Sequence, residues 1–172
     1  MQDFNKLVSL LKDKTVYIQT HNFPDPDAIA SAFGLQQLLK HFDINSTLCY
    51  EGKIDKLSAT KMLDAFDISM FAYSEICDKM KEEDAIICVD SQKNGGNITD
   101  FIGDEIAAID HHPTFVKIAY QYSDIRIIMR LRKVFVKQTS IIVKTIVIII
   151  ICLNIYILFK GIYHFLRNFI IT

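Results

Sequence analysis

Residues 15–42 read TVYIQTHNFPDPDAIASAFGLQQLLKHF, and this stretch decides the fold. Its first six residues are apolar and β-branched enough to predict a strand over 15–20. A polar loop with two prolines follows, and apolar residues then recur at helical spacing over 27–41. Asp27 is the predicted N-cap of that helix, because aspartate accepts hydrogen bonds from the first free amides of a helix. The order strand, polar loop, helix is the unit from which parallel α/β sheets are built.

One predicted helix precedes this stretch, and further strands and helices follow it. Apolar runs predict further strands at 46–50, 70–73, 85–89 and 105–109. Helical periodicity predicts helices over residues 4–14, 54–66 and 75–81. The run AIICV at 85–89 has the composition of a strand that is buried on both faces. This alternation predicts an α/β fold with a doubly wound, mainly parallel sheet.

The charge of the chain changes sign near residue 124. Residues 1–124 contain all twenty Asp and Glu residues and eleven Lys and Arg residues, which gives a net charge of −9. Residues 125–172 contain eight Lys and Arg residues and no acidic residue, which gives +8, and fifteen of these 48 residues are isoleucine. We therefore predict a domain over 1–124 and a separate basic, Ile-rich tail over 125–172, helical or disordered.

Three interpretations of this tail remain open. The first is a membrane segment over 141–159, which is borderline because Lys144 and Asn154 interrupt it, although its basic flanks would allow contact with a membrane. The second is a divergent segment of the core. The third is translation out of frame after about residue 128, because AT-rich DNA read in the wrong frame yields Ile, Lys, Asn, Tyr and Phe in excess. The lack of acidic residues favours the third interpretation.

The cysteines and the N-terminus predict a cytoplasmic location. The four cysteines stand singly, without a C-x-x-C pair, and are expected to be reduced and buried. The first thirteen residues are amphipathic and lack the continuous apolar region of a signal peptide.

Polar residues that can bind metal follow three of the predicted strands. They are His21, Asp25 and Asp27 after the first strand, Asp90 after 85–89, and Asp110, His111 and His112 after 105–109. In open parallel α/β sheets, ligands bind at the carboxyl ends of the strands, so these loops are expected to meet at one edge.

The residue types in these loops indicate which metal they suit. Pro26 biases Asp25 toward an extended conformation, in which residues i and i+2 face the same way, so that Asp25 and Asp27 can present carboxylates to one cavity. A cluster of carboxylates repels itself unless cations neutralise it. A mixture of carboxylate and imidazole without thiolate suits Mn²⁺ or a similar metal better than calcium or structural zinc.

The pattern H-x-x-P-D-x-D-A-x-x-S-A, then a strand ending in Asp, then I-D-H-H-P, resembles the DHH superfamily of phosphoesterases over about residues 15–124. Its form is most similar to the nano-RNase and exopolyphosphatase-related branch. The resemblance implies a metal-dependent phosphoesterase or exonuclease that acts on short RNA or DNA, or on small nucleotide phosphates such as phosphoadenosine phosphate. A polyphosphate or pyrophosphate hydrolase is the nearest alternative, and an inactive fragment that only binds metal is another. No stable protein partner is implied.

The resemblance also implies a role for each metal-binding residue. His21 and Asp25 would hold one Mn²⁺ ion, Asp27 and His111 would hold a second, and Asp90 would bridge the two. Two ions placed in this way promote the attack of water on phosphorus.

Two further residues would be catalytic according to the resemblance. Asp110 would orient the first histidine of the pair, and His112 would face the scissile phosphate. The family also has a fourth metal-binding aspartate and a C-terminal domain with a Gly-Gly-Gly-His loop, and neither has a counterpart in residues 125–172. The sequence therefore predicts five of the six family ligands in a truncated or frameshifted chain of uncertain activity.

Overall fold

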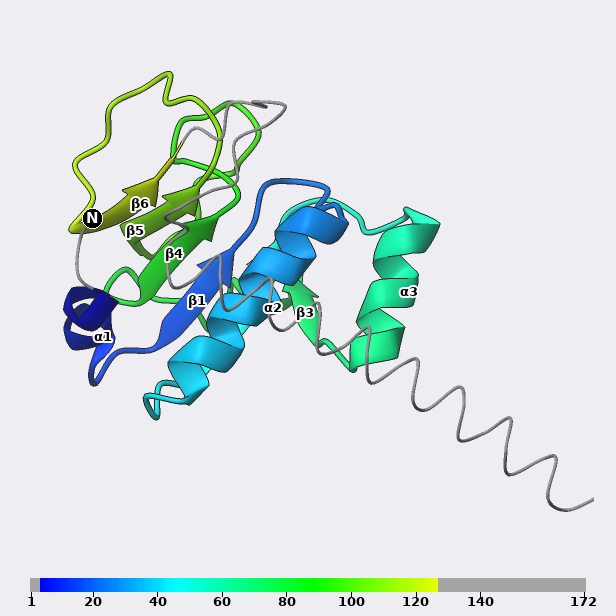
Figure 1. Ribbon diagram of the computed structural model, residues 1–172, viewed down its shortest axis with the longest axis horizontal. Helices are drawn as coiled ribbons and strands as arrows, with labels where there is room; N and C mark the ends of the chain where they lie inside the picture. Colours follow the sequence, from blue (N-terminus) through cyan, green and yellow to red (C-terminus); the bar gives the residue numbers. More distant parts are fainter. Residues whose placement is uncertain (1–3, 127–172) are drawn as a thin grey trace, which may run out of the picture. The chain divides into compact units, whose positions relative to one another are not determined.

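A parallel sheet of six strands forms the centre of the computed structural model, which describes residues 4–126 (Figure 1). The strands are β1 (Val16–Gln19), β2 (Ser46–Tyr50), β3 (Met70–Ala72), β4 (Ala85–Val89), β5 (Asp104–Asp110) and β6 (Tyr122–Ile125). Their order in the sheet is β3-β2-β1-β4-β5-β6, and every pair of neighbours is parallel. The predicted α/β fold with a parallel sheet is confirmed.

The strand at the end of the sheet, β6, is absent from the sequence prediction. Its four residues, YSDI, are too few and too polar to form a recognisable apolar run. The buried ring of Tyr122 anchors it, and Ile109 of β5 pairs with Asp124. The last residue of β6 is Ile125, so the sheet includes one residue of the predicted tail.

Four helices accompany the strands: α1 (Phe4–Leu11), α2 (Pro26–Lys40), α3 (Leu57–Phe66) and α4 (Tyr73–Ile76). The helix predicted over 75–81 is wrong in its bounds, because α4 begins two residues earlier and ends after one turn. Its start is explained by Glu75, whose Oε2 accepts a hydrogen bond of 2.7 Å from the amide of Ala72. The third helix likewise begins three residues later than predicted.

The N-cap of α2 is Asp25 and not the predicted Asp27. Asp25 has extended backbone, and its Oδ1 accepts hydrogen bonds from the amides of Asp27 (3.0 Å) and Ala28 (3.1 Å). Pro26 takes the first helical position, where the N–H that proline lacks would have no partner in any case. Asp27 therefore lies in the first turn of the helix, and the idea that Asp25 and Asp27 share one extended segment is wrong.

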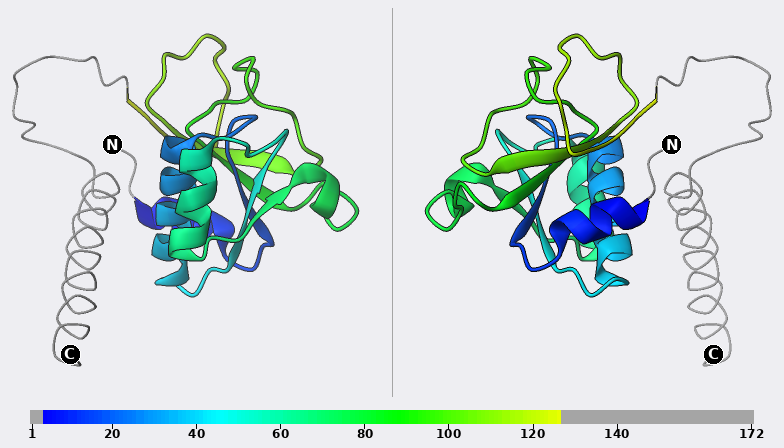
Figure 2. Two further views of the ribbon diagram at one scale, coloured as in Figure 1. Left: turned by 90° about the vertical axis from the view of Figure 1, so that its right-hand side faces the viewer. Right: turned by 90° about the vertical axis from the view of Figure 1, so that its left-hand side faces the viewer.

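Side chains alternate between the two faces of the sheet, and each face has its own core. On one face Val16 and Ile18 pack with buried residues of α1, α2 and α3, such as Leu7. On the other face Tyr17 packs in a smaller cluster with Ile76 of α4. Figure 2 shows α1, α2 and α3 on one side of the sheet and α4 on the other. Burying one Ile or Leu side chain stabilises the fold by about 1.5–3 kcal/mol. The first cluster buries more such side chains than the second, so it contributes more to the stability of the sheet.

Two connections between strands contain no helix, and both project beyond the carboxyl ends of the strands (Figure 1). Residues 90–103 join β4 to β5, and residues 111–121 join β5 to β6. They carry Asp90 and the pair His111–His112. Among the described residues, no helix has the length and apolar character that crossing a membrane requires. The predicted tail beyond Arg126, with its segment 141–159, lies outside the described residues.

Candidate metal centre

The three polar loops converge at the carboxyl edge of the sheet, because β1, β4 and β5 are neighbours in it. Asp90, which follows β4, lies between the histidines of the other two loops. Its Oδ2 is 3.7 Å from Nε2 of His21, and its Oδ1 is 3.4 Å from Nδ1 of His111 and 3.5 Å from Nδ1 of His112. Asp90 therefore connects the candidate ligands of the first loop with those of the third.

Two groups of side chains bring their ligand atoms within 4.8 Å of one another, and Asp90 belongs to both. One group is His21, Asp25 and Asp90; the other is Asp90, Asp110, His111 and His112. Metal–oxygen and metal–nitrogen bonds are about 2.0–2.2 Å long, so ligands on opposite sides of an ion are about 4 Å apart. Each group thus has the dimensions of a site for one cation.

The surroundings of Asp90 fit a bound cation. Its side chain is buried, and its Oδ1 has no hydrogen-bond partner within the part of the chain that the structure describes. The pKa of Asp90 is raised from 3.8 to about 6, chiefly by burial and also by the charge of Asp27, against the lowering effect of the nearby histidines. A buried carboxylate oxygen without a donor is costly, and a metal ion would satisfy it.

Asp90 also has left-handed backbone, with φ of +56°. Non-glycine residues adopt this conformation at a cost of about 1–2 kcal/mol, and such residues cluster at functional sites. The conformation turns the chain sharply out of β4, so that the side chain of Asp90 stays at the edge of the sheet between the loops.

The ring of His21 is oriented by its neighbour in the sequence. Its Nδ1 lies 2.8 Å from the backbone carbonyl of Asn22, which can only accept a hydrogen bond, so Nδ1 carries the proton and Nε2 is free for a metal. Asn22 is in turn held by the loop after β4. Its amide donates to the carbonyl of Asn97 (2.8 Å), and its side chain exchanges two hydrogen bonds with Thr99.

Asp110 makes a different contact from the one expected. Its Oδ1 lies 2.8 Å from Nδ1 of His112 and accepts hydrogen bonds from the backbone amides of His111 (2.7 Å) and His112 (3.2 Å). The carboxylate therefore orients the ring of the second histidine, whereas the prediction named the first. The cause is local, because an aspartate that accepts from the amide two residues ahead turns the chain back on itself.

Charge is concentrated in the pair Asp110–His112. Burial alone would raise the pKa of Asp110, but hydrogen bonds from Gln92 and His112 outweigh it and lower the pKa. The same hydrogen bond to Asp110 raises the pKa of His112. The pair thus favours an ionised carboxylate beside a protonated imidazole.

Asp27 lies close to the two groups without belonging to either. Its ligand atoms are not among those that lie within 4.8 Å of one another. Its charge nevertheless raises the pKa of both Asp90 and His112, which places it near the second group. Of the seven residues that the sequence analysis names, six belong to the two groups and Asp27 borders them.

Gln92 is a site residue that the sequence analysis does not identify. It is buried, and its Nε2 donates to Oδ2 of Asp110 (2.6 Å) and to the backbone carbonyl of His112 (3.2 Å). The one signal in the sequence is its position two residues after Asp90, but a glutamine in a loop is ordinary. Only the fold shows that its amide supports the Asp-His-His turn.

Replacing Gln92 by leucine should weaken the metal centre. Oδ2 of Asp110 would lose its donor, which should cost about 1–3 kcal/mol of folding free energy. Removal of a residue that supports a ligand typically lowers metal affinity by about 10–100-fold. Calorimetric titration with Mn²⁺ measures this loss. Gln36→Leu is the matched control, because it removes a similar bond (to the carbonyl of Ser46, 2.8 Å) far from the site. An unchanged affinity in Gln92→Leu would contradict the supporting role.

An exposed aromatic residue, Phe23, follows His21 by two positions in the same loop. Phe23 is 61% exposed, has left-handed backbone with φ of +54°, and is tied by its amide to the carbonyl of Glu51 (2.8 Å). Its ring lies against Gly52, where an added Cβ would come within 2.6 Å of it. Gly52 therefore leaves the space that this ring occupies.

Gly52→Ala should destabilise the protein and displace this ring. The φ of Gly52 is +91°, a conformation that costs an alanine about 1–2 kcal/mol. Urea unfolding of Gly52→Ala, Phe23→Ala and the double variant tests both effects. The strain of φ should persist in the double variant, whereas the clash with the ring should disappear. A fully stable Gly52→Ala would contradict the prediction.

Two basic residues near the site are paired with acids. Lys93 Nζ lies 2.6 Å from Glu105 and 3.0 Å from Asp100. Arg126 makes two bonds to the carboxylate of Asp124, at 2.6 and 3.1 Å. Both cations are therefore engaged by carboxylates rather than free for a phosphate group.

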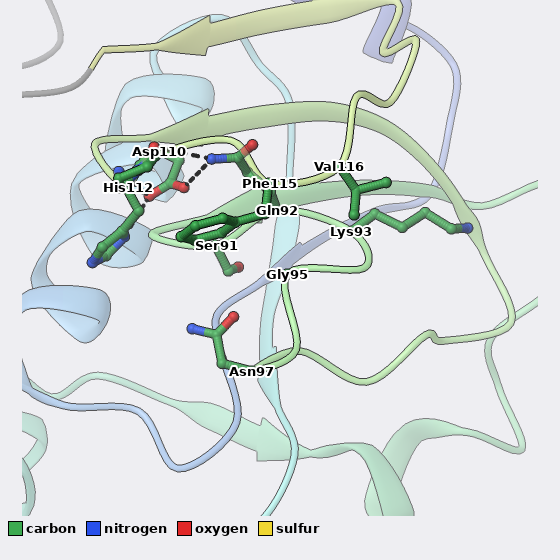
Figure 3. Close-up of a pocket in the computed structure, with 10 residues that line it drawn as sticks. Ser91, Gln92, Lys93, Gly95, Asn97, Asp110, His112, Phe115 and Val116 are labelled. Carbon is green, nitrogen blue, oxygen red and sulfur yellow. Dashed lines mark hydrogen bonds and ion pairs between the residues drawn. The ribbon is translucent and has the colours of Figure 1, made fainter.

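A pocket of about 290 Å³ adjoins the metal centre (Figure 3). Gln92, Asp110 and His112 form its inner end, and the loops that follow β4 and β5 form its walls. The ring of His112 is half exposed. A phosphate group at the metal centre would therefore have open space for an attached group beside His112.

Comparison with known proteins places this site in a family. A family model described as "DHH family, N-terminal domain" matches residues 15–140. Among solved structures, the chain is similar to an exopolyphosphatase-related protein from Bacteroides fragilis, with 21% sequence identity and a TM-score of 0.49. That match covers 72% of this chain and 37% of the other, so this chain spans little more than a third of that protein's length. A search of curated proteins gave no match.

The family match includes all three polar loops and the two groups of ligand atoms described above. The three motifs, the parallel sheet and the two groups of candidate metal ligands agree with this assignment. The chain belongs to the DHH family and carries its N-terminal domain.

Proposed function

We propose that this protein is a phosphoesterase that uses two Mn²⁺ ions to hydrolyse short oligonucleotides or small nucleotide phosphates. The observation that carries the proposal is the position of Asp90, whose two carboxylate oxygens face different groups of ligands. A structural role would not require an oxygen that is buried without a hydrogen-bond donor.

The residues of the site fall into two sets, one for each proposed metal ion. His21, Asp25 and Asp90 would hold one ion, and Asp90 and His111 would hold the other, with Asp27, which borders their group, as a further ligand. Such ions supply positive charge that offsets the phosphate and makes a water molecule more acidic. Carboxylate and imidazole ligands without thiolate favour Mn²⁺ among the common divalent metals.

His112 acts on the substrate itself. Its Nδ1 is engaged by Asp110, so Nε2 is free to donate to a phosphate oxygen. The raised pKa of His112 keeps the ring protonated closer to neutral pH, which suits a group that faces negative charge. Asp110 and Gln92 position this ring and do not themselves contact the substrate.

A hydrolysis assay with three substrates tests the proposal. Purified protein is stripped of metal, supplied with Mn²⁺ and given a short oligoribonucleotide, phosphoadenosine phosphate or pyrophosphate. We expect hydrolysis of the first two, and none in Asp90→Ala. The matched control is Asp84→Asn, because Asp84 is a buried aspartate that caps Lys81 away from the site.

Each other outcome contradicts a stated part of the proposal. Hydrolysis of pyrophosphate alone would replace the nucleotide substrate by an inorganic one. No hydrolysis of any substrate, with Mn²⁺ still bound, would mean that the chain binds metal without catalysis. Activity that survives in Asp90→Ala would remove Asp90 from the centre of the mechanism. We expect the enzyme to act in the cytoplasm, because Cys49, Cys77 and Cys88 are free thiols. Cys49 and Cys88 are buried as predicted, whereas Cys77 is only partly buried.

A further inference from the structure

The pocket beside His112 has the composition of a site for an uncharged planar group. Its apolar lining is Pro113, Phe115 and Val116, and Figure 3 shows Phe115 and Val116 across the pocket from Gly95 and Asn97. The opposite wall is the loop after β4, which contributes Gly95 and the side-chain amide of Asn97. Ligand pockets typically combine apolar walls with a few polar groups that fix orientation.

Phe115 is an aromatic surface without a partner in the described part of the chain. It is 83% exposed, and none of the stacked or edge-on ring pairs among the described residues includes it. Its neighbour Val116, also exposed, lines the same pocket, and contiguous exposed apolar side chains of this kind mark ligand-binding grooves. An aromatic ring in this position can stack against another planar ring.

Asn97 supplies hydrogen-bonding capacity on the facing wall. Its backbone carbonyl is used by Asn22, whereas its exposed side-chain amide bonds to no other described residue. Gly95 lies close to both the loop backbone and that amide, because an added Cβ would lie 2.8 Å from the carbonyl oxygen of Gln92 and 3.2 Å from Oδ1 of Asn97. An asparagine amide offers a donor and an acceptor side by side, the pattern that pairs with the edge of an adenine.

The charge of the pocket argues against a second phosphate group in it. Lys93 lines the pocket, but its ammonium group bonds to Glu105 and Asp100. In Figure 3 the Lys93 side chain extends away from His112. The pocket therefore attracts a neutral group better than an anion.

We propose that this pocket binds a nucleobase of the substrate, stacked on Phe115 and hydrogen-bonded to Asn97, while the adjoining phosphate lies at His112. The inference rests on the proposed function and narrows it, because it assigns the base a binding site and makes nucleotides the preferred substrates. Stacking on aromatic side chains is the common way in which proteins hold unpaired bases.

Binding of two small probes tests the base site without catalysis. Adenosine monophosphate and ribose 5-phosphate carry the same phosphate, but only the first has a base. With Mn²⁺ present, the wild-type chain should bind adenosine monophosphate at least about tenfold more tightly, as calorimetry measures. Phe115→Ala should remove most of this difference, and Asn97→Ala should reduce it several-fold. The affinity for ribose 5-phosphate should not change in either variant.

Phe71→Ala is the matched control, since Phe71 is an exposed aromatic residue of β3 at the far end of the sheet order. Equal affinity of the wild type for the two probes would overturn the base site, and so would a Phe115→Ala variant that weakens both equally. The two proposals fail separately. Selective binding of adenosine monophosphate without hydrolysis of any substrate overturns only the proposed function, whereas hydrolysis of nucleotides without selective binding overturns only the base site.

Discussion

Asp90→Asn is expected to stabilise the protein when metal is absent and to destabilise it relative to wild type when Mn²⁺ is present. Burial raises the pKa of Asp90 from 3.8 to about 6, so that the ionised form is costly in the folded state. A difference of this size corresponds to at most about 3 kcal/mol. Asparagine has nearly the same shape and no charge, so it removes this cost.

The sign of the effect can be followed with pH. Between about pH 4 and pH 6 the folded protein holds a proton on Asp90 that the unfolded chain has already lost. The stability of the wild type therefore falls as pH rises through this window, whereas Asp90→Asn does not titrate there. The advantage of the variant should be small near pH 4 and complete above about pH 6.

Mn²⁺ should reverse the order of the two proteins. A ligand at one hundred times its dissociation constant stabilises the folded state by about 2.7 kcal/mol per site. The wild type should gain this stabilisation at each site, whereas Asp90→Asn should not, because it lacks the shared carboxylate. Urea unfolding of both proteins at pH 4 and at pH 7.5, each with Mn²⁺ or with a chelator, measures the free energy of unfolding under these four conditions. The control Asp84→Asn should lose about 1 kcal/mol with and without metal. A destabilised Asp90→Asn in metal-free buffer at pH 7.5 would contradict the prediction.

The number of bound ions should differ among three proteins. We expect two Mn²⁺ ions in the wild type and one in His21→Ala, because His21 belongs to only one of the two groups. We expect none in Asp90→Ala at concentrations that saturate the wild type, because Asp90 belongs to both. Loss of a residue that only supports a ligand costs about 10–100-fold in affinity, and loss of a shared ligand should exceed that.

Calorimetric titration, with metal analysis after gel filtration, measures these numbers. The control is His41→Ala, since His41 caps the end of α2 and its ring packs against Phe42, away from the site. One ion in the wild type would show that the second group does not bind metal. An equal loss in His21→Ala and Asp90→Ala would show that the centre is a single site.

Much of the fold can be predicted from the sequence, because short runs of neighbouring residues indicate the strands and the loops that follow them. The run AIICV predicts a central strand, and polar loops after apolar strands predict a site at one edge of a parallel sheet. Six of the seven predicted residues belong to the two ligand groups for this reason. β6 could not be predicted, because its four residues, two of them polar, are too few to show the alternation of apolar and polar residues that indicates a strand. They form a strand only by pairing with β5.

The details of the site could not be predicted because they depend on turns and on distant residues. Asp25 caps α2 in place of Asp27 because Pro26 is tolerated at the first helical position. Gln92 reaches Asp110 across eighteen residues, and Asn22 reaches Thr99 across seventy-seven. Such contacts leave no periodic pattern in the sequence, so only the assembled sheet shows them.

The hydrogen bonds between Asn22 and the loop after β4 also restrict which mutations this loop can accept during evolution. Asn97 accepts from the residue that orients His21, and its side chain lines the pocket beside His112. An insertion or deletion before Thr99 would therefore move a metal ligand and a pocket wall together. If Asn97 and Phe115 bind the base as proposed, exchanging their side chains would alter substrate preference, whereas a change in the length of this loop would also displace His21. Preference for a new substrate should thus arise by point substitution, with the metal centre unaltered.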